Sequence, residues 1–138
     1  MKKKQSIYRV LDANYNRVRE GLRVCEDISR FFLENDVLAA AYKTIRHKVT
    51  KLILLMPAAY RSIVLTRDSE NDCGKTSFMP GGKKSSVQDV FLRNIKRAEE
   101  ATRVIEEFTK MLDEKIAFQF QKLRFSIYDL EKKTITKL

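Results

Sequence analysis

The chain has 138 residues, of which 43% are hydrophobic and 33% charged, with only 4 glycines, 2 prolines and 2 cysteines. This length suits a single domain over residues 1–138, and the composition excludes collagen-like, low-complexity and disulfide-framework proteins. No apolar run approaches the roughly 18 residues that a membrane span needs. We therefore expect a soluble protein of the cytoplasm with reduced cysteines.

The balance of charge points to anionic partners. The 28 lysines and arginines exceed the 18 acidic residues by ten, giving a net charge of +10. An excess of this size favours nucleic acid, acidic lipid or phosphorylated small molecules. A nucleic-acid-binding protein would gather its basic residues on one face. Here they are spread along the whole chain and alternate with acids, which disfavours nucleic acid.

Glycine and proline divide the chain into two helical halves and a central loop. Both prolines and three of the four glycines lie between residues 57 and 84, and such residues interrupt helices. On either side, apolar residues recur at the steps of three and four that mark an amphipathic helix. The pattern predicts four helices joined by a structured loop over 57–85. Their expected ranges are 6–33, 37–56, 86–112 and 115–133.

Capping residues support two of the expected helix starts. Asn35 and Asp36 can turn the chain and cap the second helix. Ser85 with Gln88, and Ser86 with Asp89, form two overlapping capping boxes before the third helix.

The third predicted helix repeats the first at an offset of 80 residues. The residues Asn14, Arg17, Glu20, Arg23, Val24 and Glu26 match Asn94, Arg97, Glu100, Arg103, Val104 and Glu106. Their partner helices match more weakly at an offset of 78, with Arg46 against Arg124. Two duplicated helical hairpins, over about 6–56 and 86–133, predict an all-α four-helix bundle with approximate twofold symmetry.

The repeated asparagines lie on the apolar faces of their helices. A buried carboxamide needs hydrogen-bond partners, and Asn14 and Asn94 are each accompanied by a small residue, Gly21 or Ala101. One interpretation is that the two asparagines bond to each other across the twofold axis and fix the helix register. The other is that each lines a pocket and binds a polar ligand. The charged residues around them also have two interpretations. They could serve the function, or they could form a solvated helix surface, where ion pairs at this spacing are ordinary.

The central loop holds a second group of polar residues: Arg67, Asp68, Asp72, Gly74 and Lys75. The Cys73–Thr76 segment imitates the end of a phosphate-binding P-loop, but Ser69 stands where the first glycine is required. A glycine beside basic residues can still hold a phosphate, and two aspartates can hold Mg²⁺. The alternative is a surface loop whose Asp and Gly residues only form turns.

The motifs together resemble a known family. They are the segments Arg9–Asn14, Arg17–Asp27, Arg67-Asp68, Asp72-Cys73-Gly74, Ser86-Val87-Gln88, Asn94–Arg97, Glu100-Ala101, Arg103-Val104 and Glu106-Glu107. In this order they resemble the small helical domain that is fused N-terminally to thiamine phosphate synthase in some bacteria. That family is understood as a second type of hydroxymethylpyrimidine-phosphate kinase, unrelated to the ribokinase-like enzyme that usually catalyses this step of thiamine biosynthesis. The resemblance implies ATP-dependent conversion of 4-amino-5-hydroxymethyl-2-methylpyrimidine phosphate to its diphosphate in thiamine biosynthesis.

Phosphoryl transfer needs groups that position phosphates and neutralise their charge. The candidates for phosphate and substrate contact are Asn14, Arg17, Arg46, Arg67, Gly74, Lys75, Asn94, Arg97 and Arg124. The candidates for holding Mg²⁺ are Asp68, Asp72, Glu20 and Glu100. Arg67, Asp68, Asp72 and Lys75 of the loop are the expected catalytic group. ATP would be the co-substrate. The possible protein partners are a second copy of this chain, in a homodimer, and a thiamine phosphate synthase.

Two other functions stay open at this point. A non-catalytic domain that docks on thiamine phosphate synthase or dimerises would turn over no nucleotide and would expose an apolar patch. A basic nucleic-acid-binding bundle is the weaker alternative, because the basic residues are spread along the whole chain instead of gathering on one face.

Overall fold

The computed structural model describes residues 2–56, 60–76 and 86–138. Within these ranges the chain forms helices and no β-strand, which confirms the all-α prediction. The elements are α1 (Lys2–Asp27), a π-helical turn η1 (Ile28–Phe32), α2 (Asp36–Leu54), α3 (Tyr60–Val64), a 3₁₀ turn η2 (Cys73–Thr76), α4 (Val87–Thr109) and α5 (Glu114–Ile135).

The four long helices lie close to their predicted ranges. α1 begins four residues earlier than expected and passes into η1 instead of ending as one continuous helix. The short α3 and η2 lie inside the predicted loop and were not expected. The remaining parts of that loop, 57–59 and 77–85, lie outside the described residues.

Local capping explains where the helices begin. The Asn35 side chain accepts a hydrogen bond of 2.9 Å from the Leu38 amide at the start of α2. Ser86 and Asp89 form both bonds of a capping box, each 3.1 Å, so this prediction is confirmed. The other expected box includes Ser85, which lies outside the described residues. Side-chain acceptors at these positions satisfy amides that the helix itself leaves unpaired.

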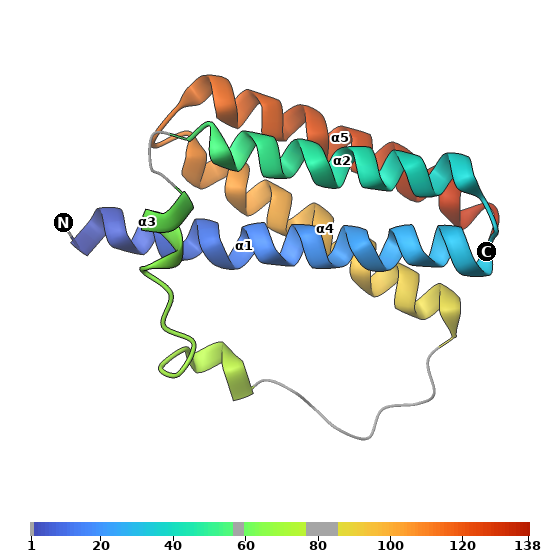
Figure 1. The fold of residues 1–138 in the computed structure, drawn as a ribbon, viewed down its shortest axis with the longest axis horizontal. Coiled ribbons are helices and arrows are strands. Elements are labelled where there is room, and N and C mark those ends of the chain that lie inside the picture. The colour runs from blue at the N-terminus through green and yellow to red at the C-terminus, as the bar shows by residue number, and fades with distance from the viewer. Residues whose placement is uncertain (1, 57–59, 77–85) are drawn as a thin grey trace.

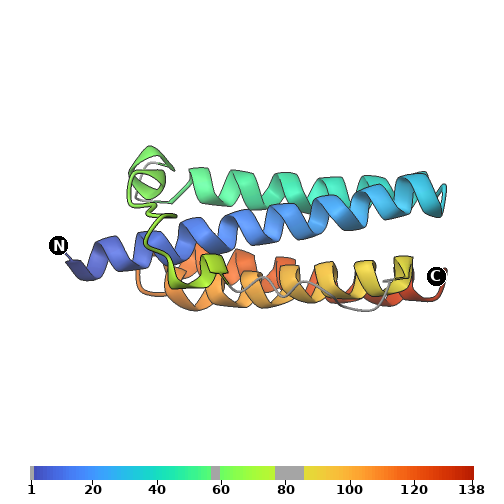
Figure 2. The same cartoon turned by 90° about the horizontal axis from the view of Figure 1, so that it is seen from below.

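The helices form two layers, with α1 and α2 in one and α4 and α5 in the other (Figure 2). α4 runs diagonally across α1, as Figure 1 shows. The two helices approach closely at Gly21, where an added Cβ would lie 2.7 Å from the Asn94 carbonyl oxygen. The space beside Gly21 is therefore filled by the α4 backbone, so it holds no ligand.

The two hairpins are fastened by matching buried ion pairs. In the first, the Arg46 guanidinium of α2 lies 3.0 Å from the Glu26 carboxylate of α1. In the second, Arg124 of α5 donates a 2.9 Å bond to Glu106 of α4. All four residues are buried. A buried charge of this kind is tolerated only when it is paired, so these pairs account for the repeated Arg and Glu without a ligand.

Around these pairs the core is apolar. Tyr42, Phe91 and Phe120 are among its largest fully buried side chains, and burial of this kind is the main source of folding free energy.

None of the described helices combines the length and hydrophobicity that crossing a bilayer requires.

Candidate functional site

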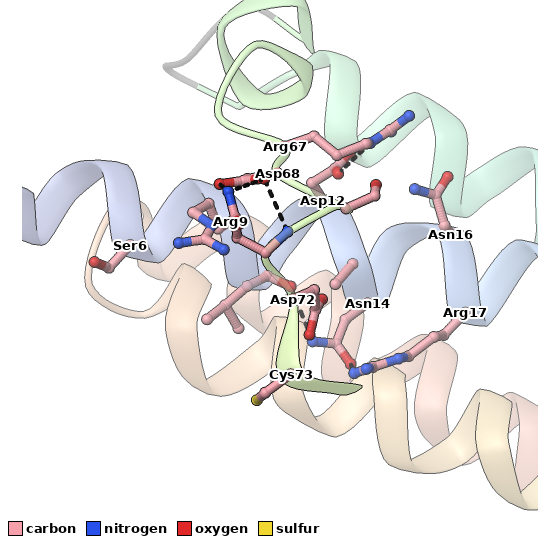
Figure 3. Close-up of a pocket in the computed structure, with 14 residues that line it drawn as sticks. Ser6, Arg9, Asp12, Asn14, Asn16, Arg17, Arg67, Asp68, Asp72 and Cys73 are labelled. Carbon is pink, nitrogen blue, oxygen red and sulfur yellow. Dashed lines mark hydrogen bonds and ion pairs between the residues drawn. The ribbon is translucent and has the colours of Figure 1, made fainter. Parts of the chain in front are cut away.

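Two adjoining cavities lie along α1, on the side covered by the central loop. The first, of about 650 Å³, lies between α1 and the loop. The second, of about 500 Å³, lies between α1, η2 and α4. Asn14, Arg17 and Asp72 line both cavities, and Figure 3 shows these side chains close together. The two cavities are therefore parts of one candidate site.

The loop is fastened to α1 by a bidentate ion pair. Arg67 donates from Nε and Nη2 to the two oxygens of Asp12, each bond 2.7 Å long. Asp12 is only 3% exposed, and its carboxylate raises the pKa of the Arg67 guanidinium above its ordinary value. Because two of the three guanidinium nitrogens are used in this way, Arg67 anchors the loop to α1.

Sequence reasoning missed Asp12. Its partner is 55 residues away, and no local pattern connects the two positions. The only sign in the sequence is that Asp12 falls inside the first of the motifs that carry the family resemblance.

Within the loop, side chains close two turns. Asp68 accepts from the amide and the side chain of Asn71 over 2.9 to 3.2 Å, and these bonds lower the pKa of the Asp68 carboxyl. The Oδ1 atom of Asp72 accepts a 2.8 Å bond from the Gly74 amide. A Cβ at Gly74 would lie 3.2 Å from that same oxygen, so glycine lets this turn close without crowding. The Lys75 ammonium donates to the Glu70 carbonyl oxygen.

The two asparagines are held in the same way but have different surroundings. Asn14 and Asn94 each donate a 2.8 Å bond to the carbonyl four residues earlier in their own helix. They do not bond to each other, so the interpretation that the two asparagines pair to fix the helix register is wrong. Asn14 also accepts a 3.2 Å bond from Arg17 and faces both cavities, whereas Asn94 lines neither of them.

The second cavity is lined by three cations and by two carboxylates, Asp72 and Glu100. In the described ranges, none of Arg17, Lys75 and Arg97 has an ion-pair partner, although all three line this cavity. The arginines Arg23, Arg46, Arg103 and Arg124, in contrast, each lie beside a carboxylate. Unpaired guanidinium groups gathered in a cavity favour an anion with several charged oxygens.

The remaining predicted residues divide into two groups. Gly74 and Glu100 line the second cavity, and Asp68 lines the first. Arg46 and Arg124 lie in the buried ion pairs between helices, and Glu20 lies on the exposed surface of α1. Neither cavity is lined by these three residues or by Asn94, so the structure does not bring them to the site.

The acidic residues here suit a cation that arrives with phosphates. No group of three or more His, Cys, Asp or Glu side chains that could hold a metal exists in the described part of the chain. Asp72 accepts the Gly74 amide at Oδ1, and the residue lines both cavities. Mg²⁺ is commonly held by one or two carboxylates together with substrate phosphates and water. Asp72 is therefore the carboxylate of this site that could contribute to holding an Mg²⁺ ion brought in by phosphates.

Comparison with known proteins adds an independent observation. The model of the ThiD2 family matches residues 9–133, which is nearly the whole chain. The chain belongs to the ThiD2 family. This confirms the family resemblance read from the motifs and gives the chain a context in thiamine biosynthesis.

Several relatives of this ThiD2 chain are named thiamine-phosphate synthase. The protein from Nostoc punctiforme is 36% identical over 128 residues, which cover 92% of this chain and 35% of that protein. The protein from Synechocystis is 37% identical over 127 residues, covering 91% and 35%. The chain thus spans about a third of the length of these relatives. No solved structure is significantly similar to it.

Proposed function

We propose that this chain is an ATP-dependent kinase that converts hydroxymethylpyrimidine phosphate to the diphosphate in thiamine biosynthesis. The observation that carries the proposal is the pair of adjoining cavities with Arg17 and Asp72 at their junction. A phosphoryl donor and a phosphorylated acceptor need two neighbouring volumes that meet at one cationic point. The family membership supplies the pathway in which such a reaction is needed.

The proposed reaction is a transfer of one phosphoryl group between two phosphates. A phosphate oxygen of the pyrimidine monophosphate attacks the γ-phosphorus of ATP and forms the new P–O bond. The bond from that phosphorus to the bridging β–γ oxygen breaks, and its electron pair leaves with ADP. The attacking oxygen is already ionised at neutral pH, because the second pKa of such a phosphate is about 6. The protein therefore needs to supply positioning and charge stabilisation and no strong base.

The residues at the junction have the properties that this role requires. Arg17 is held by Asn14 and has no carboxylate partner in the described ranges, so its charge is available to the equatorial oxygens of the transferring group. Asp72 is fixed by the turn with Gly74 and would help to hold the Mg²⁺ that accompanies the nucleotide. The bound ion would neutralise charge that develops on the donor phosphates.

The test is ADP release by the purified chain with MgATP and the pyrimidine monophosphate. The proposal predicts release only when both substrates are present, and a loss of at least ~10²-fold in kcat/KM for Arg17→Ala. Arg93→Ala is the matched control, since Arg93 is an exposed arginine of α4 that lines neither cavity. Absence of substrate-dependent ADP release from the folded chain would overturn the proposal.

A second role has its own support on α5. Phe118 and Phe125 lie two turns apart on one face of this helix and are 53% and 56% exposed. Such neighbouring exposed aromatic side chains mark contact surfaces, and the relatives named thiamine-phosphate synthase carry this segment as a third of a longer chain. We propose that this face contacts the synthase portion. Phe118→Ser with Phe125→Ser should then abolish co-elution with a separately expressed synthase portion and leave ADP release unchanged.

A further inference from the structure

We infer that the two cavities have separate tasks, an inference that rests on the proposed function. The second cavity, between α1, η2 and α4, binds the triphosphate of the nucleotide. The first cavity, between α1 and the loop, binds the phosphorylated pyrimidine. The γ-phosphoryl group passes between them beside Arg17, which lines both cavities.

Charge assigns the nucleotide to the second cavity. Its cations are Arg17, Lys75 and Arg97, and its carboxylates are Asp72 and Glu100. None of the three cations has an ion-pair partner in the described ranges. A nucleoside triphosphate brings about four negative charges in a row and carries Mg²⁺. Three cations without an ion pair, spread over α1, α4 and η2, match such an elongated anion. Asp72 lines the same cavity and would help to hold the Mg²⁺ that the nucleotide carries.

Residue chemistry assigns the pyrimidine to the first cavity. Besides its charged groups, this cavity is lined by neutral side chains that both donate and accept hydrogen bonds, which are Ser6, Asn14, Asn16, Ser69 and Asn71. An aminopyrimidine presents an amino donor and ring-nitrogen acceptors along one edge, so it needs such groups. Figure 3 labels three of these neutral residues, Ser6, Asn14 and Asn16, along α1.

The single phosphate of the acceptor also finds partners in the first cavity. Arg67 is anchored by Asp12, and its partly exposed guanidinium still lines the cavity. Arg9 lies in the same lining and has no ion-pair partner in the described part of the chain. The charge of Arg9 also helps to lower the pKa of the Asp68 carboxyl. With Arg17 shared between the cavities, the first is lined by three arginines and by the three carboxylates Asp12, Asp68 and Asp72. It therefore has no excess of positive charge, which suits a monophosphate better than a triphosphate.

Calorimetric binding separates the two assignments without requiring turnover. The probes are Mg²⁺ with a non-hydrolysable ATP analogue, and the pyrimidine monophosphate alone. Arg97→Ala should weaken binding of the ATP analogue at least tenfold and change pyrimidine binding less than twofold. Arg9→Ala should do the reverse. The control Arg93→Ala should change neither.

The outcomes distinguish this inference from the proposed function. Reversed effects, or equal weakening of both ligands by both variants, would overturn the division of tasks even in an active kinase. Absence of ADP release from a wild-type chain that binds both ligands would overturn the proposed function and leave the division standing. Failure of the wild-type chain to bind either probe would overturn both.

Discussion

The ion pair between Asp12 and Arg67 makes an asymmetric prediction about stability. Asp12 is 3% exposed, whereas the Arg67 side chain is 42% exposed. Removing the arginine leaves a buried carboxylate with no other side-chain partner in the described ranges. Removing the charge of Asp12 leaves a guanidinium that water can reach. The two substitutions should therefore have very different costs although they break the same pair.

The magnitudes follow from these surroundings. An unpaired buried charge costs about 3–5 kcal/mol, and the partial exposure of the pair places Arg67→Ala at the lower end, about 3 kcal/mol. Asp12→Asn keeps the shape and a hydrogen-bond acceptor, so it should cost about 1 kcal/mol, the size of one ordinary hydrogen bond. The double variant should be more stable than Arg67→Ala alone, because it contains no buried charge.

Urea unfolding of the three variants at neutral pH measures these differences. The same samples, assayed for ADP release, should lose activity in Asp12→Asn as the loop loosens, and a raised KM with a smaller change in kcat would mark a positioning role. Equal costs for the two single variants, or a double variant less stable than both, would refute the argument that Asp12 is a buried charge compensated by Arg67.

Three further predictions concern other parts of the molecule. Asp72→Asn should lower kcat by ~10²-fold or more, about 2.7 kcal/mol, with no change in Tm because the loop carboxylate is exposed; a loss of stability without a loss of kcat would contradict this. Burial beside Glu131 raises the pKa of Glu99 from 4.5 to about 7, so the folded state holds a proton there that the unfolded chain has lost. Stability should fall as pH rises between these values, and Glu99→Gln should flatten that fall in urea midpoints at pH 5 and 8. Gly21→Ala should destabilise the fold by ~1–3 kcal/mol, since its Cβ would lie 2.7 Å from the Asn94 carbonyl; unchanged urea unfolding would contradict this contact.

The parts of the fold that depend on neighbouring residues were predictable from the sequence. Asn35 and Ser86 cap their helices through bonds to residues three positions on, and such short-range patterns are visible in the sequence. The spacing of apolar residues likewise indicated the four long helices. The short α3 and η2 were not expected, because the sequence between 60 and 76 combines few apolar residues with many turn formers.

The candidate site was predicted only in part. The loop residues and the first asparagine meet in space as the motifs indicated. Arg46 and Arg124 shared the repeated pattern of the other arginines, yet their partners Glu26 and Glu106 lie 20 and 18 residues away on neighbouring helices. A sequence repeat marks residues that both hairpins need, and it does not separate a buried structural pair from a ligand contact. Only the packing of the helices made that distinction.

We propose above all that a phosphoryl group moves from ATP to the pyrimidine monophosphate at this site. Phosphorus NMR of the chain with MgATP and the pyrimidine monophosphate measures this directly. We expect the monophosphate signal to disappear while ADP and the two coupled signals of a pyrimidine diphosphate grow in equal amounts. Arg97→Ala should slow this conversion at low ATP. Release of inorganic phosphate with an unchanged monophosphate signal, or no change in any signal, would contradict it.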